Sequence, residues 1–83
     1  MRPHYTNAGY AIIEYEQYNA DGGNDYYIVL GADFKTNRFV TWHCRNADYF
    51  FWGHYFDSHI NARIDYHKRL VEAYKLRKEN ELK

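Results

Sequence analysis

Several side chains that can act as metal ligands lie close together in the second half of the sequence. They are His43, Cys44, His54, Asp57 and His59. Neighbouring residues on a strand point to opposite faces, so His43 and Cys44 cannot both reach one ion without a bulge. Structural zinc sites usually contain several closely spaced cysteines, whereas this chain has one cysteine and no CxxC or HxxxH pair. We therefore expect no metal site and no other cofactor.

A second group of residues could transfer protons if the fold brings its members together. The group consists of Glu14, Glu16, Asp33, His43 and Arg45. A carboxylate beside a histidine is a common acid/base pair, but opposite charges on neighbouring strands also stabilise a sheet without any catalysis. Nothing in the sequence assembles a nucleophile, a base and oxyanion donors. We expect a protein that is not an enzyme, with a small acid/base site around His43 as the alternative.

Four segments have the composition and alternation of β-strands. They are residues 10–18, 26–34, 38–45 and 49–56. Turn-forming sequences separate them, most clearly NADGGND, in which Asn, Asp and two glycines tolerate positive φ. Short connections favour an antiparallel meander. The last segment, YFFWGHYF, is predicted as a fourth strand, and the alternative is a three-stranded sheet with an irregular aromatic loop.

The sequence after Asp57 changes character and predicts one long helix. It contains no Gly or Pro up to about Asn80, and Ser58 is a suitable N-cap. An apolar stripe at helical spacing is expected to pack on the sheet. Its members are Ile60, Ile64, His67, Val71 and Tyr74, flanked by Tyr66, Leu70 and Ala73.

Together these elements predict an α+β fold in a single domain, residues 1–83. An antiparallel β-meander of three to four strands over residues 10–56 precedes one long helix at 58–80, which packs on one sheet face. Residues 1–9 are predicted to be an N-terminal tail and residues 81–83 a frayed end.

Composition limits the classes of function. The chain has 11 basic and 11 acidic residues, so it lacks the excess positive charge that supplies most nucleic-acid affinity. One cysteine allows no intramolecular disulfide, which favours a cytoplasmic location. Neither a secretory signal nor an apolar run of membrane-spanning length is visible, so we expect no membrane association.

A single helix can cover only one face of the sheet, and alternation then divides the strand residues between two faces. The residues expected to face the helix are Ala11, Ile13, Tyr15, Ile28, Leu30, Ala32, Phe34, Val40, Trp42, Cys44, Phe50, Trp52 and Phe56. The opposite face would be polar but rich in aromatic rings, and such a face is a candidate for contact with another protein.

We expect the protein to be an interaction module that binds a protein partner, or a second copy as a homodimer, through that uncovered face. The predicted contact residues are Tyr27, Phe39, His43 and Tyr55, with Glu14 and Glu16 at the rim. Aromatic anchors surrounded by polar groups are typical of binding hot spots. Single-stranded nucleic-acid binding through the same rings is the alternative and ranks second, because the chain has no net charge.

The second half of the chain resembles small uncharacterised proteins of bacterial mobile elements and phages. The resemblance lies in the aromatic spacing of FVTW at 39–42 and YFFWGHYF at 49–56, followed by a helix containing NARIDYHKR. It implies an accessory role, such as blocking or recruiting a host protein, and no established activity.

Overall fold

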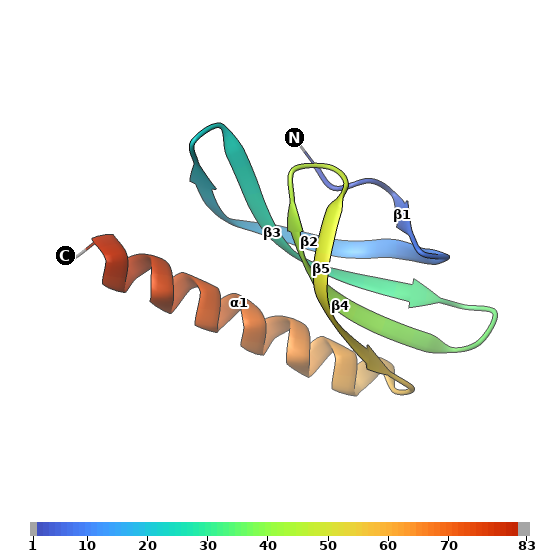
Figure 1. Ribbon diagram of the computed structural model, residues 1–83. Coiled ribbons are helices and arrows are strands. Elements are labelled where there is room, and N and C mark those ends of the chain that lie inside the picture. Colours follow the sequence, from blue (N-terminus) through green and yellow to red (C-terminus); the bar gives the residue numbers. More distant parts are fainter. Residues whose placement is uncertain (1, 82–83) are drawn as a thin grey trace.

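The described part of the chain forms one five-stranded antiparallel sheet followed by a helix (Figure 1). The computed structural model describes residues 2–81, with side chains through residue 77. The strands follow one another in chain order, and the predicted α+β meander with a C-terminal helix is confirmed. The elements are β1 Thr6–Asn7, β2 Tyr10–Asp21, β3 Asn24–Asp33, β4 Arg38–Arg45, β5 Tyr49–Phe56 and α1 His59–Glu81.

The boundaries of these elements follow from local chemistry. Gly22 and Gly23 turn the chain between β2 and β3 with φ values of 58° and 83°, a left-handed conformation that glycine adopts without steric penalty. The hydroxyl oxygen of Ser58 accepts a hydrogen bond of 3.2 Å from the Asn61 amide, so Ser58 caps α1 as predicted. β1 lies in the segment predicted as a tail. Residue 81 still belongs to α1, and residues 82–83 lie outside the described part of the chain.

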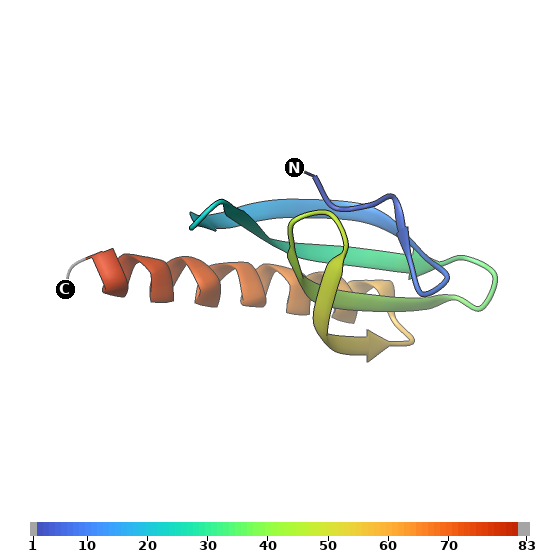
Figure 2. The same cartoon turned by 45° about the horizontal axis from the view of Figure 1, so that its top comes forward.

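The sheet lies between two coverings. In Figures 1 and 2, α1 runs along one side of the sheet, and the N-terminal end of the chain lies on the other side. The last turns of α1 extend beyond the strands. Each face of the sheet therefore has its own apolar cluster.

The helix-side cluster joins β3 and β4 to α1. Its buried members are Ile28, Leu30, Ala32, Phe39, Ala62, Tyr66 and Leu70, with Ile13, Tyr18 and Phe56 packed around them. Two of the helix residues that lie on the sheet, Ala62 and Ala73, are small, which lets the helix backbone approach the strands closely.

The far-side cluster lies on the face away from α1. It consists of Tyr27, Val29, Val40, Trp42 and Cys44, with Tyr10, Ile12 and Phe50 around them. The N-terminal segment helps to close this face, since Pro3 is fully buried and the His4 amide donates to the Ala47 carbonyl in the turn between β4 and β5. This second buried cluster was not expected from the sequence.

The predicted orientation of β4 is wrong. Pairing places Ile28 opposite His43, Leu30 opposite Thr41 and Ala32 opposite Phe39, and partners in an antiparallel pair share a face. The connection between β3 and β4 sets this register, and a shift of one residue moves every side chain to the other face. Phe39, Thr41 and His43 therefore face α1, whereas Val40, Trp42 and Cys44 face away.

Irregular pairing also reverses parts of β2 and β5. The pairing of β2 with β3 shifts between Ile12 and Glu14 and again between Gln17 and Asn19, and Tyr15 ends on the far face opposite Val29. On β5, Phe50 belongs to the far-side cluster and Trp52 is 70% exposed, so neither packs on the helix as predicted. Phe34 also fails to reach the helix, since it is exposed in the turn after β3.

The helix presents a different face to the sheet from the one predicted. Ile60, Ile64 and Val71 are 72%, 61% and 52% exposed, and they lie on the outer side of α1. The buried residues are Ala62, Tyr66, Arg69, Leu70 and Ala73. Three of these, Tyr66, Leu70 and Ala73, were predicted only as flanking positions. Within the described residues, no helix combines the length and the apolar character needed to cross a bilayer.

We predict that the N-terminal segment is part of the folded domain. Deletion of residues 1–5 should lower the free energy of unfolding by about 2–3 kcal/mol, because it removes the burial of Pro3 and two backbone hydrogen bonds, from the His4 amide to Ala47 and from the Ile12 amide to Tyr5. Denaturant unfolding measures the loss, and the rate of Cys44 labelling by a thiol reagent should rise with it. Tyr5→Ser is the matched control, because the ring of Tyr5 is 72% exposed. Unchanged stability and labelling after the deletion would contradict the prediction.

Candidate functional site: the bulge in β5 and the groove beside it

Strand β5 contains a bulge at Trp52 and Gly53. Thr41 pairs with His54 and His43 pairs with Phe51, so the single residue Trp42 lies opposite two residues of β5. The backbone φ of Trp52 is 54°, in the left-handed region. For a residue with a Cβ this conformation costs about 1–2 kcal/mol, and it is rare for a bulky side chain. The bulge therefore holds an exposed tryptophan in a strained conformation.

Gly53 permits the bulge because nothing larger fits there. A Cβ built on Gly53 would lie 2.7 Å from Nε1 and 3.0 Å from Cδ1 of Trp42. The indole of Trp42 is itself fixed by edge-on contacts with the rings of Tyr10 and Phe50, at centroid distances of 5.7 and 5.5 Å. The close approach of Trp42 to the strand backbone thus requires glycine at position 53.

A buried arginine of α1 holds the bulge from the other side. Arg69 is only 7% exposed. Its Nη2 donates to the carbonyl of Trp52 at 2.7 Å, and its Nη1 donates to the hydroxyl and carbonyl oxygens of Thr41 at 3.0 and 3.1 Å. Burial lowers the pKa of the guanidinium, while the nearby carboxylates of Asp65 and Glu72 oppose this effect. Arg69 therefore ties the helix to β4 and to the strained residue of β5.

Asp65 extends this network to the surface. Its Oδ2 accepts from the Thr41 hydroxyl at 2.6 Å and from Nδ1 of His54 at 2.9 Å. Burial alone would raise the pKa of the Asp65 carboxyl, but the hydrogen bonds from Thr41 and His54 outweigh it and hold the pKa below the usual value. The Thr41 hydroxyl accepts from Arg69 and donates to Asp65, so its hydrogen-bonding capacity is well used.

His43 lies on β4 beside the bulge. Its Nδ1 is 3.0 Å from the hydroxyl of Tyr18, and its ring stacks on Phe51 and meets Trp52 edge-on. Burial lowers the pKa of His43 to about 4, with smaller contributions from Arg69 and His54. The imidazole is therefore neutral at physiological pH.

These residues border a groove between the sheet and the second half of α1, which we call the Trp52 groove. One part has a volume of about 280 Å³ and is lined by His43, Trp52, His54, Asp65, Lys68, Arg69, Glu72, Ala73 and Leu76. An adjoining part of about 240 Å³ shares four of these residues and adds Tyr18, Asn19 and Arg77. Its exposed apolar borders are Trp52 and Leu76, which are 70% and 63% exposed.

The predicted contact residues do not share one face. Tyr27 is buried in the far-side cluster, and Phe39 is buried beneath α1, where it stacks on His59 at 4.9 Å. His43 lines the Trp52 groove. Tyr55 is exposed, but on the far face near Tyr10. Of the four predicted aromatic anchors, only His43 reaches the groove.

The two predicted rim residues lie on the helix side of the sheet. Glu14 accepts from Nη1 of Arg63 at 2.7 Å, and Glu16 accepts from the hydroxyl of Tyr74 at 2.7 Å. Both residues were expected on the face away from the helix, and this prediction is wrong. The shift in β2 pairing turns Glu14 and Glu16 toward α1. Their side chains hold the helix edge to β2.

The other candidate chemistry is dispersed. Cys44 is buried and its thiol donates to the Asn46 carbonyl at 3.3 Å; burial, with the charge of Asp48, raises its pKa to about 12. Asp33 instead caps the turn after β3 through the Lys35 amide and the Thr36 hydroxyl. Among the side chains that the structure describes, His, Cys, Asp and Glu form no group of three or more that could hold a metal.

Sequence reasoning missed the main members of the site. Trp52 was predicted to pack on the helix, and neither Asp65 nor Arg69 was among the candidate residues. One signal was present, because a glycine inside a strand often marks a bulge, and Gly53 follows Trp52 directly. Asp65 and Arg69 are also four residues apart, on the helix side that carries the small residues Ala62 and Ala73.

Comparison with known proteins finds no matching family model, no matching curated protein and no matching solved structure. The interpretation of the site therefore rests on its own geometry.

We predict that Gly53→Ala destabilises the fold by about 1–3 kcal/mol, because the added methyl group collides with the Trp42 indole. Thermal or denaturant unfolding measures the change. Gly23→Asn is the matched control, since nothing lies within 4 Å of a Cβ at Gly23 and asparagine tolerates its positive φ. If both substitutions are equally mild, the indole does not require a glycine at position 53.

We also predict a pH dependence of stability that comes from His43. Its folded pKa of about 4 lies below the ordinary 6.5, so the unfolded chain binds a proton in the interval between them. The contribution of His43 to the free energy of unfolding should therefore be fully present above pH 6.5 and be lost as the pH drops toward 4. Allowing for partial exposure, the loss due to His43 is about 1–2 kcal/mol. Asp65 contributes separately, because its lowered pKa places its loss of stability below the ordinary 3.8.

Urea unfolding at a series of pH values tests this prediction. His43→Phe, which keeps the ring contacts but cannot be protonated, should flatten the slope between pH 6.5 and 4. Tyr18→Phe should keep the slope, because burial of His43 is the largest cause of its shift and remains. A slope that persists in His43→Phe would assign the effect to other groups.

Proposed function

We propose that the protein is a non-enzymatic interaction module that holds a segment of a partner protein in the Trp52 groove. The observation that carries the proposal is the conformation of Trp52, an exposed tryptophan whose backbone is strained and held by Gly53 and Arg69. Such strain is concentrated at ligand-binding sites in proteins, where the surrounding structure maintains it. Tryptophan is also the residue most enriched at binding hot spots.

The groove suits an apolar side chain with polar neighbours. Trp52, Ala73 and Leu76 supply apolar surface, and Lys68, Glu72 and His54 supply charged or polar groups around it. The residues that line the groove include no hydroxyl or thiol except that of Tyr18, which is hydrogen-bonded to His43. This lining supports binding of a peptide segment more than a covalent reaction.

The edge of the sheet next to the groove supports an extended partner. β5 is the last strand of the sheet, and its residues YFFWGHYF include no Lys, Arg, Asp, Glu or Pro. Exposed edge strands usually carry such residues because they prevent pairing with other chains. A partner strand that pairs with β5 could place a side chain in the groove, as in other cases of recognition by strand addition. The proposed occupant of the groove is therefore an extended segment of a partner protein that pairs with β5, and a second copy of the chain that pairs through its own β5 is one case of this.

Single-stranded nucleic-acid binding is less well supported. The guanidinium of Arg2 lies 3.9 Å from the ring centroid of Tyr5, and that of Arg45 lies 4.6 Å from that of Tyr49. Each arginine covers one ring face that a base would otherwise use for stacking. The accessory role implied by the mobile-element resemblance, in which a host protein is bound, is compatible with a peptide groove and belongs to this proposal.

We predict that Trp52→Gly weakens peptide binding without unfolding the protein. Peptides selected from a random display library serve as the probe, and NMR chemical shifts locate where they bind. Affinity should fall by about tenfold or more in Trp52→Gly. Stability should change by less than about 1 kcal/mol, because relief of the left-handed strain offsets the lost ring contacts.

Tyr55→Ala is the matched control, since it removes an exposed ring of the same strand from the other face and should leave binding intact. Selected peptides that bind Trp52→Gly equally well, or that map around Tyr55, would refute the site. Binding of single-stranded oligonucleotides at low salt that depends on Trp52 would replace the protein partner by a nucleic acid.

A further inference from the structure

The outer face of α1 carries an apolar stripe that the fold does not use. Ile60, Ile64 and Val71 are each more than half exposed, and at 100° per residue they lie within about 40° of one line along the helix. They recur at spacings of four and seven residues, as residues along the seam of two supercoiled helices do. We call these three residues the outer seam. His67 and Tyr74 continue the periodicity but lie toward β2, since His67 borders a hollow with residues of β2 and Tyr74 is hydrogen-bonded to Glu16.

The contacts of α1 with the sheet keep the outer seam in solvent. Arg69 is bonded to β4 and β5, Arg63 to Glu14, and Tyr74 to Glu16, so polar ties hold both edges of the helix. The core residue Tyr66 lies between them. Rotation of α1 to bury the seam would break all of these contacts, so another molecule is needed to cover it.

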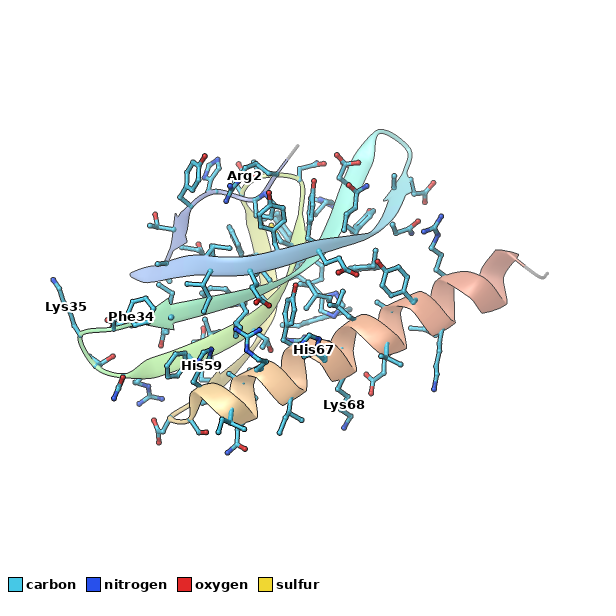
Figure 3. All side chains as sticks on the ribbon, turned by 180° about the vertical axis from the view of Figure 1, so that it is seen from behind. Arg2, Phe34, Lys35, His59, His67 and Lys68 are labelled. Atoms are coloured by element: carbon cyan, nitrogen blue, oxygen red, sulfur yellow. The ribbon has the colours of Figure 1, made fainter. Side chains whose placement is uncertain are left out.

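The charges beside the seam define the chemistry of that molecule. Lys68 and Lys75 flank one side of it and Arg63 the other. Figure 3 shows Lys68 directed away from the sheet. The carboxylate of Glu14, which pairs with Arg63, comes from β2, and Glu72 lines the Trp52 groove. Lys68 and Lys75 therefore make one flank of the seam positive, whereas the charge of Arg63 on the other flank is paired with Glu14.

A second copy of the chain fits this surface poorly. In an antiparallel pair the positions of Lys68 and Lys75 face the same flank of the partner helix, and in a parallel pair Lys68 approaches Arg63. Both arrangements bring like charges together. A lipid surface also fits poorly, because interfacial helices have a broad apolar face with bulky residues, whereas this seam is narrow.

We propose that the outer seam binds an amphipathic helix of another protein, one with acidic residues beside its apolar stripe. Ile60, Ile64 and Val71 pack into the apolar stripe of that helix, and its carboxylates pair with Lys68 and Lys75. This interface does not depend on the function proposed for the Trp52 groove, although Lys68 borders both surfaces.

A synthetic heptad peptide tests the proposal. The probe has leucine at its seam positions and glutamate at its flanking positions, and a sister peptide carries lysine in place of glutamate. Titration calorimetry should show binding of the acidic peptide, weakened by added salt, and about tenfold or more weaker binding of the lysine peptide. Equal binding of both peptides, or of neither, would overturn the proposal.

Variants of the protein supply the second arm. Ile64→Ser with Val71→Ser should weaken binding of the acidic peptide about tenfold or more, and circular dichroism should show an intact fold because both side chains are exposed. Lys68→Glu with Lys75→Glu should reverse the preference toward the lysine peptide. Trp52→Gly is the control that should bind the acidic peptide normally, so failure at the groove and failure at the seam are distinguishable. Two results would overturn the proposal and assign the seam to another occupant, provided that the peptides do not bind. Self-association in sedimentation that the seam substitutions abolish would indicate a second copy of the chain. Binding to anionic vesicles that the same substitutions abolish would indicate a lipid surface.

Discussion

The contact between the Trp42 indole and the backbone of Gly53 is the constraint on which the second half of the fold depends. A Cβ on residue 53 would lie only 2.7 Å from Nε1 of Trp42. Only glycine therefore lets the backbone of β5 lie this close to the indole. The strand therefore bulges, and the extra residue, Trp52, takes a left-handed conformation. Its carbonyl then points to α1, where Arg69 binds it.

Arg69 in turn helps to set the rotation of the helix about its axis. A guanidinium buried among strands needs hydrogen-bond acceptors, and here carbonyl and hydroxyl oxygens of Thr41 and Trp52 supply them. The face that contains Arg69 must consequently point to the sheet. Ile60, Ile64 and Val71 lie on the opposite side of α1, so satisfying one buried charge leaves three aliphatic side chains in solvent.

The sequence pattern was sufficient to locate β2 to β5 and the helix, but it missed β1 and assigned the wrong faces to β4, α1 and parts of β2 and β5. Gly22 and Gly23, Ser58 and the change in composition after Asp57 located turns and the helix start, because these signals are local. The orientation of β4 depends on the register set by the β3–β4 turn, and that of β2 on two shifts in pairing. Neither this register nor the two pairing shifts produce a local sequence signal as strong as a pair of glycines. Apolar periodicity also predicted the wrong buried face of α1. It takes no account of Arg69, which can be buried because oxygen atoms of the strands accept its hydrogen bonds.

The same reasoning explains why His43 was found and Trp52 was not. A histidine among aromatic residues attracts attention in any position, whereas a tryptophan in an aromatic strand is expected to be core. The left-handed conformation at position 52 arises from the contact of its neighbour Gly53 with Trp42, eleven positions earlier in the chain, so it cannot be read from local composition.

The two surfaces that result are physically linked through one side chain. Lys68 lines the Trp52 groove and also flanks the outer seam, because it lies between the two on α1. Coulomb attraction falls with distance and is screened in water. The ammonium group of Lys68 therefore cannot form a close ion pair with a carboxylate in the groove and with another at the seam at the same time. A ligand that binds Lys68 from the groove therefore weakens the positive flank of the seam. The fold that strains Trp52 and exposes the aliphatic stripe thus places a shared cation between the two surfaces.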